Sequence, residues 1–204
     1  MPGEDLCVAC RGGLTRLRGP RCDRCGAPTA WPVARCRECS GRRISFARAR
    51  AAIAYDEAAR KLVGAWKERG LRLLDGTAAG LVADCVPRPP VYTLTFVPAD
   101  ADRRLRRGYN PAELLARALG RRWHLPVRPL LERAAGIRPQ RGLPLTERRR
   151  NVKDAFRASA RPPRAVVLID DVYTSGATVS AAAAVLRKAG ANHVEVVTFA
   201  RAVR

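Results

Sequence analysis

Six cysteines near the N-terminus fall into three pairs with the same internal spacing. The pairs are Cys7-x2-Cys10, Cys22-x2-Cys25 and Cys36-x2-Cys39. A CxxC turn directs two thiolates at one centre, and two such turns complete a tetrahedral zinc site. Residues 1–43, which contain all three pairs, have too few aliphatic side chains to build a core of their own. The pattern therefore predicts a small zinc ribbon whose fold depends on structural metal.

Three pairs do not divide evenly into four-ligand sites. We prefer a site made from the second and third pairs, because Gly26 directly follows Cys25 and supplies the turn typical of a zinc knuckle. The first pair, Cys7 and Cys10, either joins Cys22 and Cys25 instead or reaches a second metal with ligands from elsewhere. The number of zinc ions stays open at this point.

A second chemical signature is the stretch VVLIDDVYTSGATVS at 166–180. A continuous apolar run ends in Asp170 and Asp171, and a short loop then leads into a predicted helix. Ligands of open α/β sheets lie beyond the carboxyl ends of the strands, where loop N–H groups and a helix dipole suit a phosphate. The adjacent acids suit the two hydroxyls of a ribose. The stretch predicts a ribose 5-phosphate site whose loop residues are Thr174, Ser175, Gly176, Ala177 and Thr178.

The elements that must position these residues alternate between strand and helix. Strands are expected over 49–56, 91–98, 165–170 and 193–200, and helices around 57–66 and over 76–86, 111–120 and 177–189. This alternation predicts an α/β fold with a parallel sheet and right-handed crossovers. We expect two units, the ribbon at 1–43 and a sheet domain at 44–204. Residues 132–164 show little periodicity, which is typical of a functional or mobile span.

The charge is strongly unbalanced. Lys and Arg total 39 against 18 Asp and Glu, a formal net charge of +21, and residues 101–164 alone contain 18 Lys or Arg and five Asp or Glu. A GC-rich genome explains part of the arginine content, but such an excess still favours polyanionic partners. No apolar run approaches the roughly 18–20 residues that span a bilayer, and the first residues do not resemble a signal peptide. We expect a cytoplasmic protein with no membrane insertion, whose cysteines stay reduced.

The stretch at 166–178 resembles the phosphoribosyl-pyrophosphate motif of type I phosphoribosyltransferases. Together with the CxxC pairs, VPADADRRLRRGYN at 97–110 and PQRGLPLTERRRNVKDAF at 139–156, it resembles the ComF family of competence-related proteins over nearly the whole chain. That family joins a zinc ribbon to a type I phosphoribosyltransferase core. Two features depart from it: Pro111 stands where the family usually has Gln, and fuller relatives have four CxxC pairs.

The resemblance implies phosphoribosyl pyrophosphate as a ligand, with magnesium entering on its phosphates. It implies that the ligand is contacted by a loop near the pyrophosphate that begins with Val97 and Pro98. It also implies contacts from a basic signature that contains Arg103, Arg107 and Gly108. A second signature consists of Gln140, Arg148, Asn151 and Phe156, and Lys67 matches a lysine after the first helix. The residues expected to act in catalysis are Asp170, Asp171 and Arg107.

These observations lead to one main hypothesis and two alternatives. The main one is a phosphoribosyltransferase-like protein that handles incoming DNA during natural transformation, in contact with DNA-uptake machinery. Pentosyl transfer there needs charge stabilisation on pyrophosphate and exclusion of water by a closing loop. One alternative is a non-catalytic, single-stranded-DNA-binding accessory protein with a vestigial or sensory pocket. The other is a salvage enzyme for a free nucleobase.

Single-stranded DNA is the expected nucleic-acid partner. Its phosphates would meet a group of arginines and its bases would stack on an aromatic side chain, either Tyr109 or Trp31. A surface shared with phosphoribosyl pyrophosphate is preferred over a separate site on the ribbon. The arginines are Arg103, Arg104, Arg106, Arg107, Arg148, Arg149 and Arg150.

Overall fold

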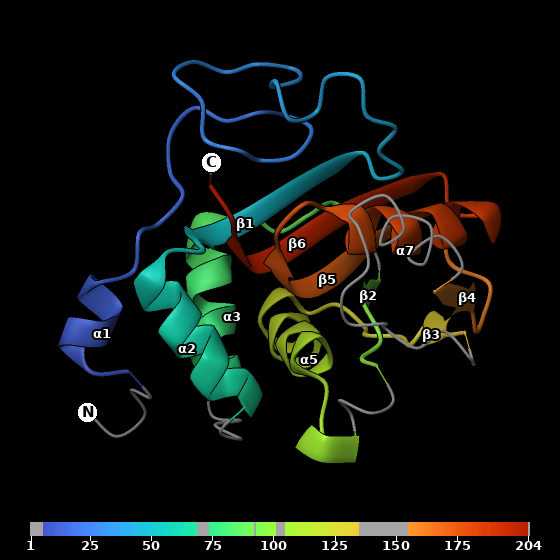
Figure 1. Ribbon diagram of the computed structural model, residues 1–204. Coiled ribbons are helices and arrows are strands. Elements are labelled where there is room, and N and C mark those ends of the chain that lie inside the picture. The colour runs from blue at the N-terminus through green and yellow to red at the C-terminus, as the bar shows by residue number, and fades with distance from the viewer. Residues whose placement is uncertain (1–5, 69–73, 92, 101–104, 135–154, 204) are drawn as a thin grey trace, which may run out of the picture.

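A computed structural model describes residues 6–68, 74–91, 93–100, 105–134 and 155–203 (Figure 1). Its centre is a four-stranded sheet in the order β1-β6-β5-β2, in which every neighbouring pair is parallel. The strands are β1 (Arg48–Ala54), β2 (Leu94–Phe96), β5 (Ala165–Tyr173) and β6 (His193–Arg201). The predicted α/β class with a parallel sheet is confirmed. No helix in the described parts of the chain is long and apolar enough to cross a membrane.

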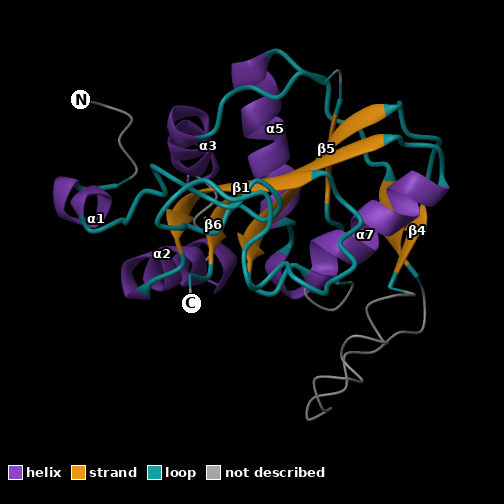
Figure 2. Ribbon diagram, turned by 90° about the horizontal axis from the view of Figure 1, so that it is seen from above, coloured by secondary structure: helices purple, strands orange, loops and turns teal. Residues whose placement is uncertain are grey.

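Helices cover both faces of the sheet. One face packs against α2 (Glu57–Glu68), α3 (Leu74–Cys85) and α5 (Pro111–Trp123), which lie below the sheet in Figure 1. The other face packs against α7 (Ala177–Lys188), which lies beside β4 in Figure 2, and against the Cys-rich segment, residues 6–43. The strand β5 is therefore buried on both faces, which explains its continuous apolar run.

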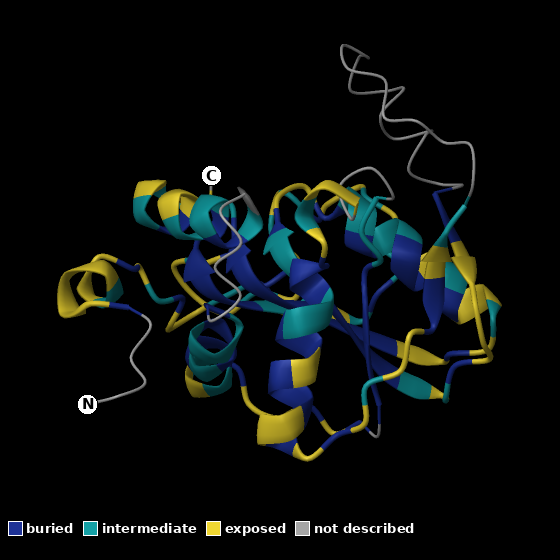
Figure 3. Ribbon diagram, turned by 90° about the horizontal axis from the view of Figure 1, so that it is seen from below, coloured by how far each residue is buried: buried dark blue, intermediate teal, exposed yellow. Residues whose placement is uncertain are grey.

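The Cys-rich segment lies along the outer edge of β1. The backbone N–H of Leu17 donates to the Ala52 carbonyl at 2.8 Å, and the N–H of Ala49 donates to the Arg24 carbonyl at 2.9 Å. An uncovered edge strand is a template for pairing with other chains, so this segment protects the sheet. The short helix α1 (Val8–Gly12) has no buried residue and lies out in solvent (Figure 3). The expected boundary between residues 43 and 44 stays a prediction.

The strand β5 is longer than its apolar run. It continues through Asp170 and Asp171 to Tyr173, because β6 supplies backbone partners that far, including Thr198 opposite Asp170. Asp171 therefore lies within the strand and not past its end, which the sequence placed at residue 170. Conversely, β2 occupies only Leu94–Phe96 of the expected 91–98.

The helix α5 also differs from its prediction, since it passes Gly120 and ends at Trp123. The left-handed residue that terminates it is His124, at φ 53°. A Cβ at Gly120 would lie 2.7 Å from the Val127 side chain and 2.8 Å from the Leu125 carbonyl oxygen. The glycine thus allows close packing inside the helix and does not end it.

The span 132–164 contains two short strands that periodicity did not reveal. They are β3 (Leu131–Arg133) and β4 (Phe156–Ala158), which pair antiparallel. Each has only three residues, too few for an alternating pattern to stand out. Residues 135–154 between them lie outside the described part of the chain.

Candidate functional site

The second and third cysteine pairs meet at one point. The Sγ atoms of Cys22, Cys25, Cys36 and Cys39, here called the cysteine cluster, all lie within 4.8 Å of one another. The Cys22–Cys39 distance is 3.9 Å and the Cys25–Cys36 distance is 3.6 Å. A tetrahedral ion with metal–sulfur bonds of about 2.3 Å needs sulfur atoms about 3.8 Å apart. The cluster therefore has the geometry of a four-cysteine zinc site.

The electrostatics of the cluster also favour a cation. Burial acts to raise the pKa of Cys22, but backbone N–H groups, including that of Cys36 at 3.2 Å, lower this pKa to about 7. Burial, aided by the neighbouring thiols, raises the pKa of Cys39 and of Cys36. Four thiolates this close, three of them buried, repel one another, and a divalent cation removes that repulsion.

Cys7 and Cys10 are not part of this cluster. Cys7 caps the N-terminus of α1, where its Sγ accepts a hydrogen bond from the Cys10 N–H at 3.4 Å, and both side chains are exposed. Among the described residues, the geometry brings together the preferred set and not the alternative in which the first pair joins Cys22 and Cys25. A second metal held with ligands from elsewhere stays a prediction.

The predicted 174–178 loop, whose last two residues form the start of α7, lies at the carboxyl end of β5, beside the end of β2. The helix that follows β2 packs on one face of the sheet, and the helix that follows β5 packs on the other. At such a switch point, a crevice opens between the strand ends, and ligands of open α/β sheets lie there. The predicted loops after Phe96 and after Tyr173 are therefore neighbours at the usual ligand position of this fold class.

The conformation of the loop requires glycine at position 176. Gly176 has φ 73°, and a Cβ there would overlap the Tyr173 side chain. As the residue that precedes α7, Gly176 gives the helix no side-chain cap, while Thr174 and Ser175 are exposed. Ser175 Oγ accepts from the Ala177 N–H at 3.4 Å, and the other peptide N–H groups at the start of α7 suit an anion.

The two acids at the end of β5 have different partners. Asp171 Oδ2 lies 2.8 Å from Lys67 Nζ at the end of α2, and its N–H donates to Asp170 Oδ1 at 2.9 Å. Burial and the charge of Asp171 raise the pKa of Asp170 to about 7. Near neutral pH, Asp170 can therefore either donate or accept a hydrogen bond.

The loop after β2 is held from two sides. Asn110 caps α5 and donates from Nδ2 to the Val97 carbonyl at 2.9 Å, and Arg133 Nε donates to the Pro98 carbonyl at 3.2 Å. Pro111 is the first residue of α5, a position where a proline loses no helical hydrogen bond. This geometry explains why a proline is tolerated at position 111.

The cysteine cluster and the 174–178 loop are linked by Arg201, which no sequence pattern identified. Arg201 is 1% exposed and donates to the Cys25 carbonyl, and its guanidinium lies 5.0 Å from the centre of the Tyr173 ring. Tyr173 in turn fills the space next to Gly176. Arg42, from the Cys-rich segment, also donates to the Ser175 carbonyl at 2.6 Å. The loop therefore rests on groups that the cysteine cluster helps to position.

No protein-family model matches the chain. The chain is 29% identical to competence protein F of Haemophilus influenzae over 96% of each chain. The resemblance to ComF proteins is confirmed. DNA utilization protein YhgH of Escherichia coli O157:H7 is 37% identical over 49% of this chain and 45% of its own. The crystal structure of a purine phosphoribosyltransferase from Pyrococcus horikoshii covers 61% of this chain and 81% of its own, with TM-score 0.35 and 16% identity. That likeness is distant, so the fold class rests on the strand order and parallel pairing.

Several residues that the ComF resemblance implied lie close to one another in the sheet. Val97 and Pro98 lie in the loop beside the end of β5, where Asp170 and Asp171 lie next to the 174–178 loop. Gly108 has φ 71°, and Arg107 is half-buried. Outside the described part of the chain are Arg103, Arg104, Gln140, Arg148, Arg149, Arg150 and Asn151.

The structure decides between the two aromatic residues expected to stack on bases. Tyr109 is buried and its hydroxyl donates to the Trp66 carbonyl, so its ring cannot receive a base. The expectation for Tyr109 is therefore wrong. Trp31 is 68% exposed and stays a candidate.

Proposed function

We propose that this chain binds phosphoribosyl pyrophosphate with magnesium at the ends of β2 and β5, and that it acts in the handling of DNA taken up by the cell. The observation that carries the ligand is the combination of a glycine loop, a helix start and two acids at the carboxyl end of β5. The DNA role is supported by relatives named as competence and DNA utilization proteins.

The proposed pose follows the chemistry of each group. The N–H and hydroxyl groups of the 174–178 loop surround the 5-phosphate, and Asp170 and Asp171 accept from the ribose hydroxyls. The pyrophosphate extends toward the Val97–Pro98 loop, where Arg107 stabilises the charge that develops as it leaves. Magnesium, when bound on the phosphates, supplies further neutralising charge.

We also propose that the cysteine cluster holds zinc in a structural role. All four ligand positions are filled by protein thiolates, so no coordination position remains for water or substrate. The cluster lies in a segment whose other buried side chains are few, which is the setting of a metal that stabilises a fold. Zinc here would position Arg201 and, through it, the loop.

The ligand proposal is tested by titration calorimetry with phosphoribosyl pyrophosphate and magnesium. We expect the Asp170→Asn, Asp171→Asn double variant to lower the affinity at least about tenfold, since both ribose contacts lose charge. Gly176→Ala should weaken binding similarly, because the new Cβ displaces Tyr173. Asp84→Asn, an exposed site on α3, is the matched control. Unchanged affinity in the double variant refutes the proposed site.

A separate measurement distinguishes an enzyme from a sensor. Release of pyrophosphate from the bound ligand in the presence of nucleobases or DNA indicates pentosyl transfer. Tight binding without any release supports the non-catalytic alternative, in which the pocket reports ligand levels. Arg107→Ala should lower the rate of release more than the affinity if this arginine acts on the leaving group.

A further inference from the structure

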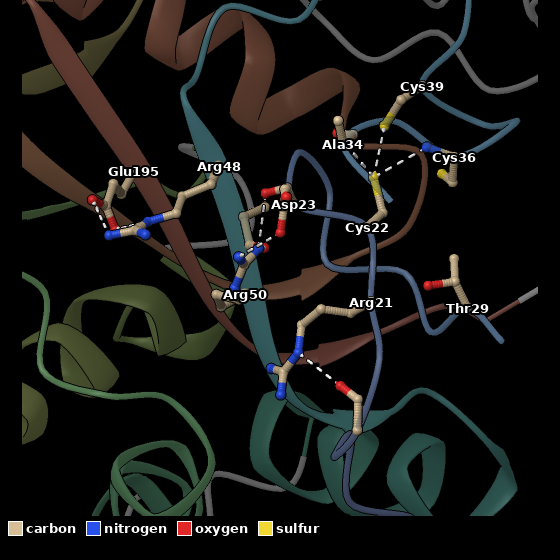
Figure 4. Close-up of polar contacts among 12 residues, drawn as sticks. Arg21, Cys22, Asp23, Thr29, Ala34, Cys36, Cys39, Arg48, Arg50 and Glu195 are labelled. Atoms are coloured by element: carbon tan, nitrogen blue, oxygen red, sulfur yellow. Dashed lines mark hydrogen bonds and ion pairs between the residues drawn. The ribbon is translucent and has the colours of Figure 1, made fainter. Parts of the chain in front are cut away.

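A basic groove of about 770 Å³ lies between the Cys-rich segment and the first residues of β1 and β6. The segment contributes Arg24 and Arg35, β1 begins with Arg48 and Arg50, and β6 contributes Glu195. Figure 4 shows Arg48 reaching Glu195 and Arg50 reaching Asp23 across this region. The volume falls in the range of ligand sites, and no part of the proposed sugar-phosphate site lies in it.

The two carboxylates of the groove do not cancel its positive charge. Glu195 is buried and clasped by Arg48, with Nε at 2.8 Å and Nη2 at 2.9 Å, while His193 Nε2 lies 2.9 Å away. The Asp23 side chain is 72% exposed and its carboxylate lies 3.9 Å from Arg50 Nη2, while Arg50 Nη1 donates to the Asp23 carbonyl at 3.0 Å. One carboxylate is thus already neutralised, and the other is held weakly in water.

Arg50 donates to the carbonyls of Asp23 and Ala49, but Arg24 and Arg35 have unused hydrogen-bonding capacity. Arg24 donates from Nη2 to the Ile44 carbonyl at 2.7 Å, but its buried Nε has no hydrogen-bond partner among the described residues. Arg35 is exposed, and no partner is found for it in the same part of the chain. Burial, together with the charges of Arg21 and Arg48, lowers the pKa of Arg50. An anion bound here would reduce the repulsion between these arginines and accept hydrogen bonds from the donor groups that lack a partner.

An aromatic side chain lies in the same loop of the Cys-rich segment. Trp31 is 68% exposed and comes three residues before Ala34, which lines the groove together with Arg35. Surfaces that bind single-stranded nucleic acid combine cations that follow the backbone with exposed aromatic rings on which bases stack. Trp31 and Arg35 are both exposed and lie four residues apart in the sequence. Free phosphate would use the arginines but not the tryptophan.

We propose that this groove binds the backbone of single-stranded DNA, with Trp31 stacking on a base. The inference rests on the proposed DNA-handling function and assigns that function to a site of its own. Glu195 pairs with Val167, six residues before Tyr173, so the groove is about 20 Å along the sheet from the 174–178 loop. This geometry favours the separate site on the ribbon over the surface shared with phosphoribosyl pyrophosphate.

The test is fluorescence anisotropy of a labelled oligothymidylate of about 15 nucleotides with the full chain, measured over a series of salt concentrations. We expect Arg35→Ala to lower affinity about fivefold at 0.1 M salt and the log–log salt slope by about 0.7, the share of one phosphate contact on a single strand. Trp31→Ala should lower affinity about tenfold with the slope unchanged. Both side chains are exposed, so neither variant should disturb folding. Arg121→Ala, an exposed position on α5, is the control for charge alone.

Competition separates this proposal from the ligand site. Phosphoribosyl pyrophosphate with magnesium should leave DNA affinity unchanged, and the Asp170, Asp171 double Asn variant should bind DNA like the wild type. Displacement of DNA by that ligand, or equal losses in Arg35→Ala and Arg121→Ala, overturns the proposal. Equal affinity for a duplex of the same length also overturns it. If no DNA binds even at about 50 mM salt, where phosphate contacts are strongest, the DNA role itself fails, whereas failure of the ligand site appears only in the calorimetry.

Discussion

The Cys-rich segment and the sheet domain are stabilised by different physical interactions. The sheet buries a continuous apolar interior, in which Trp66 and Phe199 meet edge to face with ring centres 6.0 Å apart. In the segment, three of the buried positions next to the sheet are cysteines, namely Cys22, Cys25 and Cys39. Thiols therefore occupy the place that apolar side chains occupy elsewhere, so we expect the segment to depend on a bound metal, whereas the sheet depends on burial of apolar surface.

The two regions are nevertheless joined at one buried cation. Arg201 ends β6, and its Nε donates to the neighbouring Ala202 carbonyl at 3.2 Å, while its other polar contacts are with the segment, at the Cys25 carbonyl and at Glu38 Oε2, 3.4 Å away. Its position over Tyr173 connects those contacts to the 174–178 loop. A change in the segment should therefore reach the proposed ligand site even though the apolar interior of the sheet is untouched.

Loss of metal should give the largest difference in stability between the Cys-rich segment and the sheet domain. Metal binding contributes on the order of 10 kcal/mol to folding in small zinc domains. We expect the Cys22→Ser, Cys36→Ser double variant to lose zinc by elemental analysis and to be cleaved by protease within residues 6–43. The far-ultraviolet circular dichroism of the sheet domain should largely remain.

The matched control for this experiment is the Cys7→Ser, Cys10→Ser double variant. These exposed cysteines lie outside the cysteine cluster, so its zinc should remain and protease resistance should be close to that of the wild type. Full zinc occupancy after replacement of Cys22 and Cys36 would contradict the assignment and point to the first pair.

Replacement of the connecting cation should give the second largest effect. Arg201→Met keeps the side-chain volume but removes the donor to Cys25, the partner of Glu38 and the cation over Tyr173. Breaking a buried charge contact of this kind costs about 3 kcal/mol. We expect a lower free energy of unfolding in urea, weaker binding of phosphoribosyl pyrophosphate, and unchanged zinc content.

Arg201→Lys separates the effect of the charge from that of the guanidinium geometry, because lysine keeps the positive charge but lacks the planar set of donors. It should recover part of the stability but less of the ligand affinity. If Arg201→Met unfolds more easily yet binds phosphoribosyl pyrophosphate like the wild type, the cation stabilises the fold without positioning the loop.

The smallest expected effect is the pH dependence contributed by the sheet. The pKa of Asp170 is about 7 in the folded chain and about 3.9 when unfolded. Between these values the folded state binds more protons, so this contribution to stability is complete below pH 4 and is lost as the pH rises through 7. From pH 5.5 to 7.5 the free energy of unfolding should fall by about 2 kcal/mol.

Urea denaturation of the wild type and of Asp170→Asn at several pH values measures this contribution as a difference. The variant cannot ionise at this position, so its stability should vary less over the same range. Parallel curves for the two proteins would show that Asp170 ionises at a pH well below 7. Any shared slope then belongs to other groups, including the thiols that bind metal.

Much of this protein was predictable from local patterns in the sequence. The CxxC spacing, the apolar run of β5 and the glycine loop before α7 each involve residues within a few positions of one another, and local chemistry determines what they do. The predictions failed at element ends. The strand β5 continues through Asp170 because β6 supplies partners, and α5 passes Gly120 because a glycine is needed there for packing.

Only the tertiary structure decided which cysteines share a centre, why Tyr109 is buried and where the cations gather. Arg201 meets Cys25 across 176 positions of sequence, and Arg42 meets Ser175 across 133. The basic groove likewise combines Arg35 of the Cys-rich segment with the start of β1 and β6. No periodic pattern in the sequence predicts such contacts. They form only when the Cys-rich segment packs along the edge of the sheet, and β6 of that sheet comes from the opposite end of the chain.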